Sequence, residues 1–220
     1  MRPRSRLLTT GLTCLGSLAW PSMAQAHSPI AGIGTFYSYM LHPLVVPAHA
    51  LLLLATALML GQQPRAAARI NLVLLLLGFA SGLAISGAGA FGGVPERVLL
   101  AGALLMGGAV ILGRQWPRSV IAPAVAAAGL AIGLDSAPDR SNDQEISLAF
   151  SGLVCGFIGV ATIITGLTIG FSKDWQRIGV RIAGSWIVAI SILVLALSMA
   201  AESRHPSTAT ILTSGRSSSC

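Results

Sequence analysis

The sequence predicts an all-α, polytopic membrane protein with six transmembrane helices that follow a cleaved signal peptide. Hydrophobic residues make up 54% of the 220 residues and charged residues only 10%, whereas a soluble domain carries about 25% charged residues. The mean hydropathy is +0.77. These few charges disfavour a soluble enzyme and a disordered chain. The net charge of +7 does not indicate a nucleic-acid partner, because the basic residues are scattered between long apolar runs. The expected environment is a lipid bilayer.

The N-terminus has the pattern of a secretory signal peptide over residues 1–26. Three arginines precede a short apolar run, Pro21 ends that run, and an Ala-Gln-Ala cleavage sequence finishes at Ala26. A basic segment, a short apolar segment and small residues at the cleavage site are typical of a cleaved signal. The mature chain would then begin at His27. The alternative is an uncleaved first helix.

Six apolar segments follow and are expected to form one transmembrane domain over residues 27–200. A membrane-spanning helix needs about 20 residues, and segments of this length and apolarity do not suit barrel strands. The third and fourth are short, so their ends must extend into the flanking residues or the bilayer must thin locally. The Ser/Thr-rich residues 201–220 are expected to form a flexible external tail. The six segments cover residues 35–60, 70–86, 98–112, 119–134, 146–171 and 178–200.

The charges of the loops predict the orientation. One alternating set of loops holds seven basic residues and one acid, Asp174, while the other set and the tail hold four basic residues and six acids. Basic residues favour the cytoplasmic side. The first set is therefore expected inside and both mature termini outside, as a signal peptide followed by an even number of spans also requires. The seven basic residues are Arg65, Arg69, Arg114, Arg118, Lys173, Arg177 and Arg181.

Four pairs of glycines spaced four residues apart occur within three of the spans. This spacing places two glycines on one helix face, where neighbouring backbones can approach closely. We expect helix packing rather than a permeation path from this pattern. The pairs are Gly78 and Gly82, Gly129 and Gly133, Gly152 and Gly156, and Gly166 and Gly170.

Two histidines in the first span are candidate metal ligands. His42 and His49 are seven residues apart, which places both imidazoles on one face of a regular helix, about 10 Å apart. One metal ion would not reach both rings at that distance, but Pro47 lies between them and favours a kink that brings them closer. Imidazole suits nickel, cobalt, copper and zinc. The alternative is two histidines hydrogen-bonded to neighbouring helices.

Two further residues are candidate ligands. His27, if it is the mature N-terminus, offers an amine and an imidazole that together chelate a cation, although any residue can follow a signal sequence. Asp135 ends the fourth span at its expected outer end. It is either a metal ligand or an ordinary interfacial carboxylate.

These features resemble the HupE/UreJ family of hydrogenase- and urease-accessory membrane proteins. The family's first-span motif, His-Pro-x-x-x-x-Asp-His, is matched by His42, Pro43 and His49. Its fourth-span motif, His-Gly-x-Ala-His-Gly-x-Glu, is approached by residues 130–135, and its sixth-span Arg-x-x-Gly is present as Arg181 and Gly184. The resemblance implies nickel or cobalt uptake, six spans and the same orientation in a bacterial inner membrane. The metal is then a transported ion and no permanently bound cofactor is expected.

The chain departs from the family pattern at three places. Ala48 stands where the family has Asp, the fourth-span segment has no histidine, and the fifth span has Thr162 and Thr165 but no histidine. Two hypotheses follow: a divalent-metal permease, and a non-transporting scaffold or assembly partner that has lost the metal path. A membrane enzyme is disfavoured, because the sequence contains no nucleophile–base pair, nucleotide-binding loop or H-E-x-x-H run. Expected partners are lipid, the metal ion and further copies of the chain.

We predict that the mature chain starts at His27. N-terminal sequencing of the membrane-extracted protein checks this. The expected result is a chain from which residues 1–26 have been removed. Recovery of an intact chain starting at Met1 would instead indicate an uncleaved first helix and seven spans.

Overall fold

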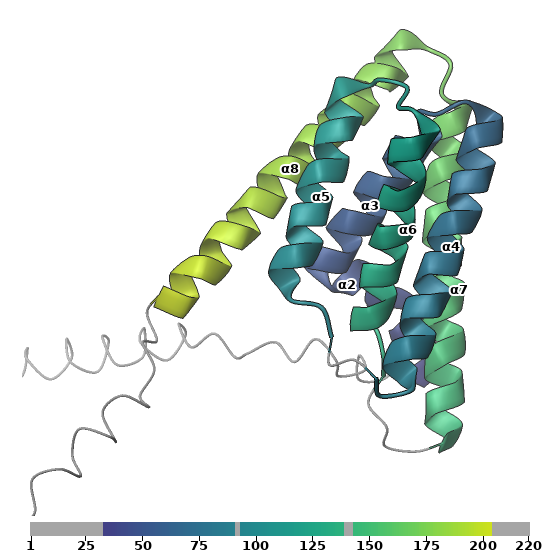
Figure 1. Ribbon diagram of the computed structural model, residues 1–220, viewed down its shortest axis with the longest axis vertical. Helices are drawn as coiled ribbons and strands as arrows, with labels where there is room; N and C mark the ends of the chain where they lie inside the picture. The colour runs from purple at the N-terminus through teal and green to yellow at the C-terminus, as the bar shows by residue number, and fades with distance from the viewer. Residues whose placement is uncertain (1–32, 91–92, 139–142, 204–220) are drawn as a thin grey trace, which may run out of the picture.

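The computed structural model describes residues 33–90, 93–138 and 143–203, and in these residues the fold is entirely helical (Figure 1). The predicted signal peptide, His27 and most of the predicted tail lie outside the described residues. Each expected span corresponds to a helix or to a pair of helices. The seven described helices are α2 (Thr35–Val45), α3 (Pro47–Gly61), α4 (Arg65–Gly87), α5 (Glu96–Leu112), α6 (Arg118–Asp135), α7 (Asp143–Gly170) and α8 (Asp174–Ser203).

Helix α3 is the centre of the bundle. Eleven of its fifteen residues are buried, and it contacts every other described helix. Around it, α4 packs along α6, α7 packs along α2, and α5 packs along α8. The stacked rings of Phe79 and Phe157, with centroids 3.9 Å apart, join α4 to α7 in the core.

The expected continuous first span is broken into α2 and α3, which are bent by 70° relative to each other. Val46, between them, has an extended backbone with φ −81° and ψ 113°. Proline disfavours the helical conformation in the residue that precedes it, and Pro47 itself suits the first position of the next helix. The sequence predicted a kink here, and the structure corrects its size to a complete break.

Three of the four glycine pairs mediate close helix packing, as predicted. A Cβ atom added to Gly78, Gly82, Gly129 or Gly133 would overlap backbone atoms across the α4–α6 contact, and one added to Gly152 or Gly156 would overlap α2. The prediction was wrong for the fourth pair. Gly166 and Gly170 have open space where a Cβ would lie, because this face of α7 borders a groove instead of a helix.

The outer surface of the bundle carries many exposed large apolar side chains, including Leu77, Leu105, Ile163, Trp186 and Leu197. A surface of this kind is suited to lipid. Four described helices are long and apolar enough to cross a membrane, or five spans if the bent α2–α3 pair counts as one. The helical class is therefore confirmed but the number of six spans is not, because α5, with 17 residues, is too short to count with these spans.

The loops fall at two ends of the bundle, as the charge pattern required. The α3–α4, α5–α6 and α7–α8 connections lie together at the upper end in Figure 1, and the α4–α5 connection lies at the lower end. The seven basic residues of the first loop set thus gather at the upper end, hereafter the basic end. Asp135, at the C-terminus of α6, lies at the opposite end.

We predict that Gly156→Ala destabilises the protein, because the new methyl group must displace the backbone of α2 at Met40. Overpacking of this kind costs about 1 to 3 kcal/mol. Thermal unfolding in detergent, followed by intrinsic fluorescence, checks the prediction. The matched control is Gly159→Ala on the same helix, where the methyl group meets open space and alanine, the better helix former, should be neutral or stabilising. Equal unfolding temperatures for the two variants would contradict the packing role of Gly156.

Candidate metal site

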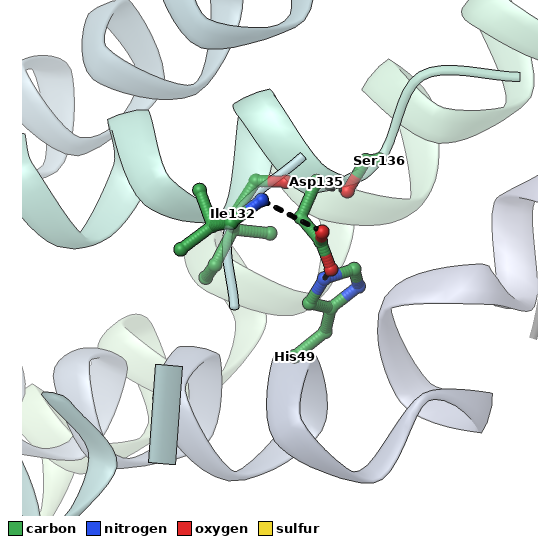
Figure 2. A network of polar contacts seen from close by, with 5 residues as sticks. His49, Ile132, Asp135 and Ser136 are labelled. Carbon is green, nitrogen blue, oxygen red and sulfur yellow. Dashed lines mark hydrogen bonds and ion pairs between the residues drawn. The ribbon is translucent and has the colours of Figure 1, made fainter. Parts of the chain in front are cut away.

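The candidate site is built around His49, in the first turn of α3. Its side chain is only 1% exposed. Its Nε2 atom lies 2.9 Å from Oδ2 of Asp135, which ends α6. Figure 2 shows the imidazole of His49 pointing directly at the Asp135 carboxylate. Two of the predicted site residues, 86 positions apart in the chain, are thus joined by a side-chain contact.

Asp135 occupies an electrostatically unfavourable position. A helix C-terminus carries a partial negative charge that repels a carboxylate, and Asp135 is the last residue of α6. Two donors offset this repulsion: the backbone N–H of Val94 at 3.1 Å from Oδ1, and His49. The carboxylate is 24% exposed. Asp135 is therefore held in place by α3 and by the segment before α5, unlike a freely solvated interfacial carboxylate.

The loop before α5 depends on a glycine to reach Asp135. Gly93 has φ +97°, a conformation that other residues rarely adopt, and a Cβ atom there would lie 3.1 Å from Oδ1 of Asp135. Glycine thus allows the backbone to turn beside the carboxylate and present the N–H of Val94. The sequence analysis missed both residues, since a backbone donor leaves no side-chain pattern in the sequence.

The contact with Asp135 determines the state of the His49 ring. A carboxylate only accepts hydrogen bonds, so Nε2 of His49 carries the proton in this pair. The other ring nitrogen, Nδ1, is buried and has no hydrogen-bond partner among the described residues. A buried N–H without an acceptor is costly, so Nδ1 is the ring nitrogen that is better placed to accept or to bind a ligand. Asp135 leaves this nitrogen free.

The break between α2 and α3 brings His42 close to His49. The centroids of the two rings are 5.4 Å apart and the rings are inclined at 58°. A regular helix would have separated them by about 10 Å, so the break brings the two rings to about half that distance. His42 is 7% exposed, and the centroid of the Tyr39 ring lies 6.2 Å from that of His42. The sequence analysis did not include Tyr39.

The other polar candidates do not join the site. His27 lies outside the described residues. Thr165 donates a hydrogen bond to the carbonyl of Ala57, just over two helical turns along α3 from His49, and Thr162 is exposed. Within the described part of the chain, no group of three His, Cys, Asp or Glu side chains could hold a metal ion. The site therefore consists of two close imidazoles, one of them held by a carboxylate.

Fold and site together define an all-helical membrane protein with ionisable side chains buried in its bundle, an arrangement that is expensive and usually functional. The model of the HupE / UreJ protein family matches residues 15–194. The chain belongs to this family, which confirms the resemblance seen in the sequence. Membership identifies a membrane protein concerned with nickel or cobalt handling for hydrogenase or urease. Neither the curated proteins nor the solved structures gave a significant match.

Proposed function

We propose that this protein is a permease for a divalent transition metal, nickel or cobalt, that serves hydrogenase or urease maturation. The observation that carries the proposal is the contact of the buried His49 with the partly exposed Asp135, with the ring of His42 5.4 Å from that of His49. The proposed cargo is a metal ion that passes through the site, so the protein needs no permanently bound cofactor and no enzymatic activity. The proposed location is a bacterial inner membrane.

The separation of the two imidazoles suits one shared metal ion. A coordinating imidazole nitrogen lies about 2.1 Å from the metal, so two rings that share an ion have centroids roughly 4.5 to 6.5 Å apart, depending on the angle between them. The observed 5.4 Å lies within this range. His49 would bind through Nδ1, the nitrogen that Asp135 leaves free.

Asp135 then acts as the residue that orients His49. A carboxylate that accepts the N–H of a ligating histidine fixes the ring and makes its other nitrogen a better donor. From the sequence, Asp135 was predicted as a direct ligand; its 2.9 Å contact with Nε2 of His49 supports the orienting role instead. With two imidazoles as its only side-chain ligands the site is ligand-poor, unless backbone carbonyls, water or His27 contribute. Weak binding suits a transported ion, which must also leave.

We predict that His42→Ala and His49→Ala each abolish nickel or cobalt accumulation while the amount of protein stays near that of the parent. Asp135→Asn should reduce uptake about 10-fold, because loss of an orienting group costs about 10- to 100-fold in metal affinity. Uptake by the parent should fall in mildly acidic medium, because protons compete for the imidazole lone pairs. Initial rates of radiolabelled metal uptake in whole cells check these expectations.

The matched control is Asp174→Asn, which removes the same charge at the basic end and should leave uptake unchanged. Parent-like accumulation by both histidine variants, or no accumulation by the parent, would overturn the permease proposal. This protein would then be better described as a scaffold or assembly partner that has lost the metal path. The absence of histidine from residues 118–170 agrees with that alternative.

We also predict that the basic end faces the cytoplasm and that the loop around Asp139 lies outside, because basic residues favour the cytoplasmic side. Single cysteines at positions 141 and 176, in a background without native cysteines, report this when whole cells are treated with an impermeant thiol reagent. Labelling at position 141 alone is expected. Labelling at 176 and not at 141 would invert the topology.

A further inference from the structure

Away from the histidines, the basic end contains a polar cavity. It has a volume of about 330 Å³ and lies where α3, α5 and α7 end and where α4 and α8 begin. Three arginines line it: Arg65 from α4, and Arg177 and Arg181 from α8. Three glutamines, Gln62, Gln63 and Gln115, also belong to its wall.

The arginines of this cavity have no acidic partner in the described structure. The ion pair found there joins His49 to Asp135 at the other end of the bundle, and Asp174 is the only acid in this set of loops. Several guanidinium groups that line one cavity without carboxylates are a favourable environment for an anion, and guanidinium geometry suits a phosphate. The cavity therefore has an excess of positive charge that no acidic side chain neutralises among the described residues.

Two backbone features complete the anion environment. Helix α4 begins beside the cavity after Pro64 and has no side-chain cap, so its first N–H groups add positive potential where an anion would sit. Gly113 ends α5 with φ +56°, and a Cβ atom at this position would lie within 3 Å of the Arg181 guanidinium. Glycine leaves space for Arg181 to lie against the loop at the cavity wall.

A groove of about 450 Å³ continues from the cavity along the outside of the bundle. It shares Arg65 and Ile169 with the cavity and runs between α4 and α7 past Leu72. Gly166 and Gly170 form its floor on α7, where a Cβ would meet open space. In a bilayer this space must be filled, since an empty groove would leave its lining without contacts.

From the arginine cavity and this groove we infer a binding site for one anionic phospholipid. The phosphate lies among Arg65, Arg177 and Arg181, and one acyl chain lies along the groove over Gly166 and Gly170. The two ends of the ligand match the two parts of the site: charge complementarity holds the headgroup, and apolar burial holds the chain. The site is separate from the histidines and does not require metal transport.

The test compares lipid retention by purified full-length protein variants. Native mass spectrometry of protein extracted from nanodiscs made of phosphatidylglycerol and phosphatidylcholine should show one retained phosphatidylglycerol on the parent. The double variant Arg65→Gln/Arg181→Gln should lose retention at least 10-fold. The control Arg114→Gln/Arg118→Gln removes the same charge from the same end without touching the cavity or the groove, and should retain lipid as the parent does.

A second variant tests the groove alone. Gly166→Leu fills the proposed position of the acyl chain and keeps all three arginines, so it should reduce retention of phosphatidylglycerol several-fold. Equal losses in the cavity and control arginine variants would indicate non-specific attraction to charge and overturn the site. Saturable binding of inorganic phosphate by delipidated protein, without retained lipid, would assign the cavity to a soluble anion and also overturn it.

Discussion

The break between Val46 and Pro47 is the constraint on which the rest of the structure depends. Proline disfavours the helical conformation in the residue that precedes it; Val46 is extended, and the chain turns by 70° at this point. The turn allows α3 to run through the centre of the bundle, where every other described helix packs on it. It also places His49 in the first turn of the most buried helix, within reach of the end of α6.

Close packing of glycine faces makes the position of α6 equally definite. Gly129 and Gly133 press α6 against α4 so tightly that no Cβ atom fits between them. The C-terminus of α6 is therefore fixed relative to the core, and with it the carboxylate of Asp135. A negative charge at a helix C-terminus is unfavourable, and here the N–H of Val94 and the ring of His49 offset that cost.

The helical class, the family and a kink at Pro47 were predictable from the sequence, as was the choice of His42 and His49 as candidate ligands. Apolar runs, prolines and imidazoles each indicate these features by residue type and spacing alone. The sequence did not predict that Asp135 contacts His49, since a contact across 86 positions depends on how α3 and α6 pack. The donor at Val94 and the open face at Gly166 were missed for the same reason. A glycine spacing identifies a smooth helix face but not whether a neighbouring helix covers it.

Under the proposed function, the two ends of the bundle act on the cation in opposite ways: one end attracts it and the basic end repels it. A divalent ion enters where acids and imidazoles lie and would leave where seven basic residues gather. Unpaired arginines there would repel an emerging cation over roughly 8 Å, the screening length at physiological salt. An anionic phospholipid seated among Arg65, Arg177 and Arg181 would neutralise part of that charge. Lipid bound at the basic end would then lower the barrier to release, which links the site on the lipid-facing side to transport through the core.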